Sequence, residues 1–309
     1  MDTKWGYEYI GALNLMIVVL LERLTNQSSI NAIESRKIEE AARMFGCKVY
    51  SFPSNIEEFD NVDDVFAYIP QFDEPILGIW VGVIPSYERY QLIYKIALKK
   101  NIHLINTPDQ HRNAMEFDQF YPKLEGLTPK SVIIESLSEI SVVLETMEFP
   151  LFVKGAIKSN KDGGWSAVVA NNVEELEVIA GDLLSREHRS RGKIIIRELV
   201  QFNHIAIDPN GFPIGREYRA FVYKNDILAY GFYWDDYEDN QKLRGSTKQF
   251  FLDCLLEASN RVDTPFLSID IGQLVNGDWI IIEIGDGQFS GLSTIPILEL
   301  WSKIKDLKL

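Results

Sequence analysis

Hydrophobic and polar positions over residues 1–108 alternate in blocks that predict helices and strands in turn. Apolar residues recur at helical spacing over 30–45, and Gly46 follows, a residue favoured just past a helix end. Short apolar runs between polar segments predict buried strands at 47–52, 75–84 and 102–105. This order predicts a βαβ domain with a parallel α/β sheet.

Two further segments of this region complete the prediction. The apolar run over 10–24 fits either a strand or a helix, and Ser86 is placed to cap a helix over 86–99. No GxGxxG motif follows any of the strands, so dinucleotide binding is not indicated. A weak boundary at 106–108 ends the domain.

The pattern from 109 onward is mixed and predicts an α+β region. A polar, helical stretch extends to 124, and further helices are predicted at 136–147, 172–184, 249–261 and 295–305. Strands are predicted at 131–134, from 151, and at 167–169 and 193–200. A hairpin over 214–234 turns near Asn225 and Asp226, and a second one closes the chain.

The closing hairpin carries two acids within otherwise apolar strands. Asn276 and Gly277 predict a two-residue type I′ turn. Counting outward in antiparallel register places Asp270 opposite Glu283, where like charges destabilise a sheet. A cation between them is the simplest relief, and Asp286 follows as a third acid. These hard oxygen ligands suit Mg²⁺ or Mn²⁺. The alternatives are a register slip, or acids that both point into solvent.

Composition and charge restrict the function. The chain has 309 residues, 46% hydrophobic and 25% charged, which is ordinary for a globular protein. Its net charge of −14 argues against non-specific nucleic-acid binding and gives no reason to expect an anionic membrane as partner. Two distant cysteines fit a reducing cytoplasm, and the longest early apolar run is too short to span a bilayer. The four histidines show no ligand spacing.

An anionic ligand must therefore be held by local basic residues. A strand with Lys154 leads into a loop with Lys158, Lys161, Gly163 and Gly164. Glycines let backbone N–H groups approach an anion and lysines add charge, which predicts a phosphate-covering hairpin. The alternative is an exposed hairpin whose lysines only solubilise it. The GK[ST] ending of a Walker loop is absent.

A second basic region lies on the 214–234 hairpin and after it. Strand alternation places Glu217 and Arg219 on one face and Arg216 on the other. Arginine can donate two hydrogen bonds to phosphate, although a surface arginine paired with an acid is the commoner arrangement. A basic cluster follows at Lys242, Arg244 and Lys248.

Taken together, the order of these parts resembles the ATP-grasp superfamily. The segments REYRAFV at 216–222 and IIEIGDGQFSGL at 281–292 look most like its R-two-K clade, with a more distant likeness to ligases that add glutamate to protein tails. The resemblance implies a pre-ATP-grasp domain at 1–108 and an ATP-grasp domain at 109–309. Two α+β subdomains, the lid at about 130–200 and the catalytic part at about 201–309, would clamp ATP.

The resemblance also implies roles for single residues. Lys154 matches the lysine on the α and β phosphates, and Arg219 the arginine on the transferred phosphate; these two are the candidate catalytic residues. Asp270 and Glu283 match the magnesium ligands. Other matches are the phosphate lid (Lys158, Gly163, Gly164), the adenine hinge (Glu198, Leu199, Val200), the ribose acid (Glu217), and assisting cations (Lys242, Arg244 or Lys248).

Two positions depart from the pattern of the family. Most relatives carry Asn two residues after the second acid, where this chain has Gly285, so Asp286 or Gln288 is the candidate replacement. The upstream lysine that many relatives use on ATP has no clear match, and Arg112 or Lys123 is the candidate there.

The function that the resemblance implies is an ATP-dependent carboxylate–amine ligase with Mg-ATP, acting through an acylphosphate and releasing ADP. The alternatives are a phosphotransferase and a nucleotide-binding interaction protein without catalysis. The carboxylate and amine substrates, small molecules or peptides, stay open. The aromatic strand at 230–234 and the acidic run at 235–239 are one candidate site for the acceptor substrate. The oligomeric state stays open, and a homodimer is one possibility.

Overall fold

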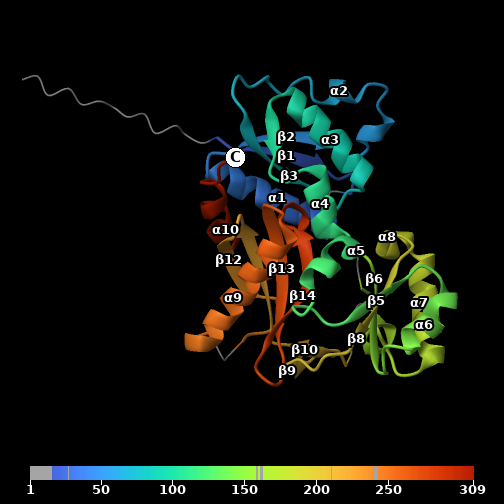
Figure 1. Ribbon diagram of the computed structural model, residues 1–309. Helices are drawn as coiled ribbons and strands as arrows, with labels where there is room; N and C mark the ends of the chain where they lie inside the picture. Colours follow the sequence, from blue (N-terminus) through green and yellow to red (C-terminus); the bar gives the residue numbers. More distant parts are fainter. Residues whose placement is uncertain (1–15, 27, 158, 161–162, 210, 240–242) are drawn as a thin grey trace, which may run out of the picture.

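The computed structural model describes residues 16–309, apart from 27, 158, 161–162, 210 and 240–242. Within the described residues the chain forms three four-stranded sheets and one two-stranded ribbon, arranged as in Figure 1. Below, the three sheets are called the N-terminal, middle and C-terminal sheet. No described helix has the length and apolar character needed to cross a membrane.

The N-terminal sheet is parallel, as predicted, with strand order β2-β1-β3-β4. Its strands are β1 (Val18–Arg23), β2 (Lys48–Pro53), β3 (Ile76–Val81) and β4 (Ile102–Leu104). One face packs on helix α3 (Tyr87–Lys99), and the other packs on α1 (Ile30–Met44) and on the C-terminal helix α10 (Ile297–Ile304). The α10 contact joins this sheet to the C-terminal sheet in one core.

The predicted ends of these helices are confirmed by their local geometry. The hydroxyl of Ser86 accepts a hydrogen bond from the backbone N–H of Arg89, which satisfies one of the free donors at the start of α3. Gly46 follows α1 with φ +84°, a conformation that glycine adopts without strain. Two short helices, η1 (Ile56–Glu58) and α2 (Val62–Val65), connect β2 to β3.

A helical connection leads from the N-terminal sheet to the middle sheet. Thr107 and Gln110 form a reciprocal capping box at the start of α4 (Pro108–Met115). The turns α5 (Phe117–Phe120) and η2 (Tyr121–Leu124) follow, so the polar stretch after the boundary is helical, as expected.

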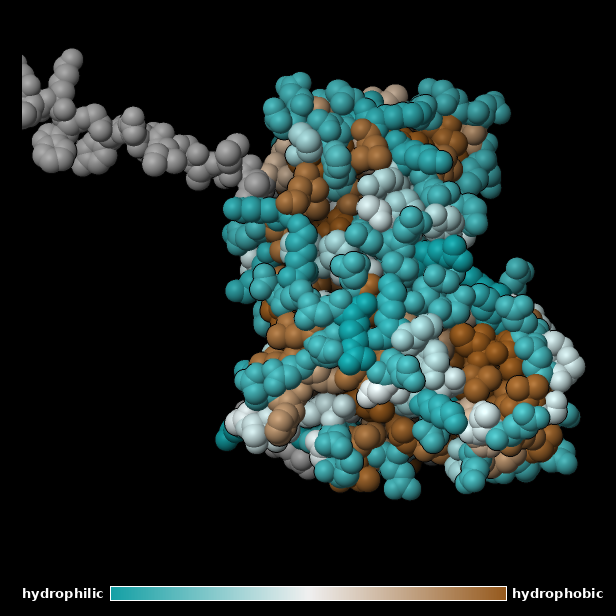
Figure 2. Space-filling view, in the orientation of Figure 1, coloured by the Kyte–Doolittle hydropathy of each residue, from teal (hydrophilic) through white to brown (hydrophobic). Residues whose placement is uncertain are grey.

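The middle sheet is antiparallel, with order β5-β8-β6-β7. It consists of β5 (Ser131–Ile134), β8 (Ile194–Glu198), β6 (Leu151–Gly155) and β7 (Val169–Ala170). Helices α6 (Ile140–Leu144) and α7 (Val173–Ser185) pack on one face, and η3 (Leu137–Glu139) and α8 (Glu187–Ser190) complete the unit. In Figure 2 hydrophobic side chains gather at the lower right, where this sheet lies in Figure 1.

Two predictions for this unit are wrong in detail. The helix expected over 136–147 consists of only η3 and the five-residue helix α6. The second strand of the lysine hairpin has only two residues, because the one-turn helix η5 (Trp165–Ala167) occupies the preceding positions.

The C-terminal sheet is antiparallel, with order β12-β11-β13-β14. Its strands are β11 (Glu217–Tyr223), β12 (Asp226–Phe232), β13 (Phe266–Gln273) and β14 (Trp279–Asp286). Helix α9 (Gly245–Val262) packs on one face, and the turn η6 (Gly287–Phe289) follows β14. A separate ribbon of β9 (His204–Ile207) and β10 (Pro213–Gly215) precedes this sheet.

The closing hairpin differs from its prediction at the turn. The backbone N–H of Gly277 donates to Leu274 O at 2.9 Å, and that of Leu274 donates to Asp278 O at 2.8 Å. Gly277 has φ +94°, whereas Asn276 has no positive φ. The connection is therefore a three-residue loop ending in a left-handed glycine, not a type I′ turn. Two successive positive φ values, as in type I′, occur instead at Lys224 and Asn225, between β11 and β12.

A β-bulge further along the hairpin compensates for the extra residue in the loop. Ile271 pairs with Ile281, and the next pair is Asp270 with Glu283, so Ile282 is the extra residue on β14. The three-residue loop shifts the register by one and the bulge shifts it back. The predicted pairing of Asp270 with Glu283 is confirmed.

Candidate functional site

One row of side chains crosses three strands of the C-terminal sheet. Arg219 on β11 pairs with Asp270 on β13, which pairs with Glu283 on β14. The guanidinium donates to both carboxylate oxygens of Asp270, with Nε–Oδ1 at 2.7 Å and Nη2–Oδ2 at 2.8 Å. Lys154 reaches this row from β6 of the middle sheet, with Nζ 2.8 Å from Glu283 Oε1. The row therefore joins two sheets.

Each opposed acid thus has a cationic side chain as partner. These two cations offset the repulsion between the carboxylates, a role that was predicted from the sequence for a metal ion. Burial lowers the pKa of Arg219, but the charge and hydrogen bonds of Asp270 raise the pKa by more, so the guanidinium stays charged. Arg219 also donates to Gly291 O at 2.9 Å and lies 5.0 Å from the ring centre of Tyr233.

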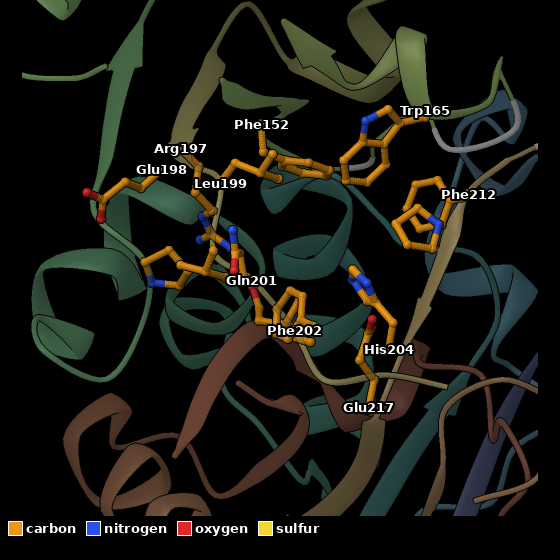
Figure 3. A pocket seen from close by; sticks show the side chains of 14 residues that line it. Phe152, Trp165, Arg197, Glu198, Leu199, Gln201, Phe202, His204, Phe212 and Glu217 are labelled. Carbon is orange, nitrogen blue, oxygen red and sulfur yellow. The ribbon is translucent and has the colours of Figure 1, made fainter. Parts of the chain in front are cut away.

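An apolar pocket lies between the middle sheet and the β9–β10 ribbon (Figure 3). The predicted hinge residues and Glu217 meet in it, together with aromatic residues from both sides. Its lining comprises Pro129, Phe152, Trp165, Arg197, Glu198, Leu199, Val200, Gln201, Phe202, His204, Phe212, Pro213, Glu217 and Ile282.

The predicted hinge residues lie at the end of strand β8. Strand β8 ends at Glu198, so Leu199 and Val200 continue beyond the regular ladder. The Glu198 side chain is exposed and points away from the pocket in Figure 3. This geometry fits a segment that presents backbone groups to a flat ring.

Arg197 is a site residue that the sequence prediction missed. Its Nε donates to Ser131 Oγ at 3.0 Å, and Nη1 donates to Ile282 O at 2.8 Å. The second bond satisfies the carbonyl of the bulged residue and ties β8 to β14. Burial lowers the pKa of Arg197 to about 10. Strand alternation gave the available signal, because it places Arg197 and Glu198 on opposite faces.

The segment between the hinge and Glu217 forms the β9–β10 ribbon. His204 and Phe212 from β9–β10 line the pocket, with Phe212 5.4 Å from Trp165 and 6.1 Å from Trp234, measured between ring centres. Partial burial lowers the pKa of His204. The aromatic contact joins the lysine hairpin to the ribbon across the pocket.

The structure describes only some of the other residues that were predicted to contact phosphate. Lys158, Lys161 and Lys242 lie outside the described residues. Gly164 has φ +79°, and a Cβ on Gly163 would lie 2.6 Å from the Cβ of Ala167, so both positions favour glycine. Arg244 is exposed at the start of α9, and Lys248 Nζ lies 5.7 Å from the ring centre of Tyr230.

Asp286 lies apart from the acid pair, which corrects its prediction as a metal ligand. It is three residues beyond Glu283, so strand alternation turns it to the opposite face. Its side chain is fully buried, with Oδ2 2.9 Å from His111 Nδ1 and Oδ1 accepting from the Gln288 N–H at 3.0 Å. Within the described part of the chain, no three His, Cys, Asp or Glu side chains gather as a metal site.

Gln288 is also buried in the core, where its side chain is hydrogen-bonded. Its side chain accepts from Trp80 N at 2.9 Å and donates to Tyr90 Oη at 2.8 Å. These bonds fasten the end of β14 to the N-terminal sheet and to α3. Gln288 is therefore also not placed to replace the missing asparagine.

Neither candidate for the upstream lysine lies in the pocket lining. Arg112 Nε is 2.9 Å from Glu116 Oε2 on its own helix. Lys123 Nζ donates to Val262 O at the end of α9, at 3.2 Å. Both make structural contacts, so these two expectations are not supported.

Three solved structures show the same fold over nearly their whole length. The VanG D-Ala:D-Ser ligase from Enterococcus faecalis has a TM-score of 0.61 at 14% identity, covering 94% of this chain and 95% of that one. D-alanine–D-alanine ligase from Bacillus anthracis, complexed with ATP, has a TM-score of 0.65 at 12% identity, covering 94% of this chain and 96% of that one. A RimK domain protein ATP-grasp from Sphaerobacter thermophilus has a TM-score of 0.58 at 10% identity, covering 94% of this chain and 98% of that one.

Sequence comparison gives the family itself. No curated protein matches the chain significantly. The model of the ATP-grasp domain, R-two-K clade family 3, matches residues 147–304, just over half of the chain. This stretch includes Lys154, the pocket hinge and the whole row from Arg219 to Glu283. The chain therefore has the ATP-grasp fold and belongs to the R-two-K clade of ATP-grasp domains, family 3.

Proposed function

We propose that this protein is an ATP-dependent carboxylate–amine ligase. The observation that carries the proposal is the row of two cations and two carboxylates, Lys154, Arg219, Asp270 and Glu283, in the same two-sheet unit as an apolar pocket. Several proteins of similar fold are ligases by name, and one of them was solved with ATP. We also propose the domain division at 108 and the subdomain division near 200.

The proposed nucleotide position follows from the chemistry of the lining. The apolar pocket would hold the base against the backbone of 198–200, with Glu217 directed at the ribose. Lys154 and the glycines at 163–164 would contact the phosphates. Arg219 would contact the phosphoryl group that is transferred.

A divalent metal fits the acid pair by donor type. Asp270 and Glu283 supply hard carboxylate oxygens that face each other, the ligands that Mg²⁺ and Mn²⁺ prefer. Lys154 and Arg219 hold the two carboxylates by hydrogen bonds. When bound, the metal would neutralise charge on the phosphates. Lys154 and Arg219 would then exchange carboxylate partners for phosphate partners, which keeps each buried charge paired.

The proposed reaction has two steps. A carboxylate oxygen of the substrate attacks the γ-phosphorus of ATP, the bond to the β–γ bridging oxygen breaks, and ADP leaves. An amine then attacks the acyl carbon of the acylphosphate and loses a proton as phosphate leaves. Arg219 and Lys154 stabilise the charge of the transferred group. No protein nucleophile takes part.

Positional isotope exchange tests the first step directly. The protein is incubated with Mg²⁺, ATP labelled with ¹⁸O in the β–γ bridge, and pools of carboxylic acids without amine. Reversible acylphosphate formation predicts that the label moves to non-bridging β-phosphate positions only when the correct acid is present. ATP that is bound but never scrambled across all pools would favour the non-catalytic alternative.

We further propose a cytoplasmic location. Cys47 and Cys254 are free thiols, as expected of a reducing compartment. Burial raises the pKa of each thiol to about 11, which keeps both protonated near neutral pH.

A further inference from the structure

A pair of serines occupies the sheet face directly beside the two acids. Ser268 precedes Asp270 by two residues on β13, and Gly285 follows Glu283 by two residues on β14, so all four positions share one face. Ser268 and Gly285 are paired in the ladder. The Oγ of Ser290, in the loop after η6, lies 2.5 Å from Ser268 Oγ.

The serine pair fills the space above Gly285. A Cβ built on Gly285 would lie 2.8 Å from Ser268 Oγ and 3.1 Å from Ser290 Oγ. Ser290 Oγ also lies 3.1 Å from Asp286 O, so its one hydroxyl proton serves either that carbonyl or Ser268. Two neutral hydroxyls, already bonded to one another, therefore lie where a side chain at 285 would project.

The hydrogen bonds described for the two acids come from cationic side chains. Three of the four carboxylate oxygens accept hydrogen bonds from Lys154 or Arg219. On the side away from the serines, a Cβ on Gly272 would lie 2.5 Å from the ring of Phe202. A second divalent ion, about 3.5–4 Å from the first, needs donors of its own. Lys154 and Arg219 are cations and the Phe202 ring is apolar, so none of these three side chains supplies such a donor.

We infer that the nucleotide complex of this protein holds one divalent ion, between Asp270 and Glu283, because the Ser268–Ser290 pair closes the position beside them. This inference rests on the proposed function, since it concerns the metal of the proposed ATP site. It assigns Ser268, Gly285 and Ser290 as the residues that set the number of ions.

Counting bound Mn²⁺ tests the inference without measuring activity. The full chain is dialysed to equilibrium against Mn²⁺ and a non-hydrolysable ATP analogue, and bound Mn²⁺ and nucleotide are counted by electron paramagnetic resonance and absorbance. One Mn²⁺ per bound nucleotide is expected. Two would overturn the inference and leave the proposed function standing. Nucleotide bound without any Mn²⁺, or no binding at all, would overturn both.

A variant tests the role of the serines. Ser268→Ala and Ser290→Ala together with Gly285→Asn open the space and place an amide oxygen in it, which is expected to raise the count to two. The matched control has the two alanines but keeps Gly285, and its count is expected to stay at one. A folded triple variant that still binds one ion would contradict the assignment to the serine pair. Circular dichroism checks folding, and the wild-type count decides if the triple variant does not fold.

Discussion

The two acids of the row lie opposite each other but differ in burial, and this predicts different costs for removing their charges. Asp270 and Arg219 have side chains only 6% and 17% exposed, joined by two charge-assisted hydrogen bonds. Asp270→Asn leaves the guanidinium without its charged partner, and breaking a buried pair costs about 3–5 kcal/mol of unfolding free energy. The Glu283 side chain is 40% exposed, although its partner Lys154 is only 6% exposed. Water therefore screens this pair in part, and the cost of Glu283→Gln is expected to be smaller, about 1–2 kcal/mol.

The two substitutions are nevertheless expected to have similar effects on turnover. Each removes one of the two proposed metal ligands, and ADP formation is expected to fall by at least about 10²–10³-fold, the size of one lost electrostatic contact in a transition state. Urea denaturation measures stability and a coupled assay measures ADP. Glu257→Gln, which breaks a surface pair with Arg261, is the matched control and should change neither. Equal losses of stability in the two variants, or undiminished turnover in either, would refute the reasoning.

Three further predictions concern other parts of the molecule. Trp165→Ala removes an aromatic wall of the pocket and is expected to weaken binding of an ATP analogue by about 1.5–3 kcal/mol in calorimetry; unchanged affinity would place the base elsewhere. Gln288→Leu leaves the buried backbone N–H of Trp80 on β3 without its acceptor, whereas the Tyr90 hydroxyl on α3 keeps its bond to Asn106 O. It should lower the unfolding free energy by about 1–3 kcal/mol, unlike a surface Gln249→Leu. Cys47 and Cys254, with pKa values of about 11, should react slowly with iodoacetamide at pH 8 and faster in urea; fast labelling of the native protein would contradict this.

Periodicity predicted strands β2, β3 and β4 of the N-terminal sheet, because buried strands between polar segments carry strong local signals. It left β1 open between strand and helix, since a short apolar run fits both. Ser86 and Gly46 mark helix ends through their own chemistry, and neither depends on distant contacts. The short helix α6 and strand β7 were harder, since tertiary packing and the turn η5 decide where they stop.

The acid pair shows how a correct contact can follow from incomplete reasoning. The loop at Gly277 has one residue more than expected, and the bulge at Ile282 compensates for it. A bulge has no reliable sequence signal here, because Ile282 looks like any other apolar strand residue. The carbonyl that it leaves outside the ladder is satisfied by Arg197, 85 positions away in the sequence, a contact that local patterns do not predict.

The sequence also did not predict which cationic side chain pairs with each acid. Lys154, Glu283, Arg219 and Asp270 were each identified as site residues. The pairing of Lys154 with Glu283 depends on how the middle and C-terminal sheets meet, and that of Arg219 with Asp270 depends on the register between β11 and β13. Asp286 was misplaced for the opposite reason. Its position in a glycine-flanked loop soon after Glu283 suggested a third metal ligand, whereas His111 and Gln288 hold it fully buried.

The central claim is that the site couples ATP cleavage to joining a carboxylate and an amine. The most direct measurement is the release of phosphate from Mg-ATP in the presence of an acid, an amine, or both, with mass spectrometry of the products. The proposed ligase predicts stoichiometric ADP, phosphate and amide only when both substrates are present. A phosphorylated acceptor that persists when the amine is added, with no amide formed, would contradict the claim and identify a phosphotransferase.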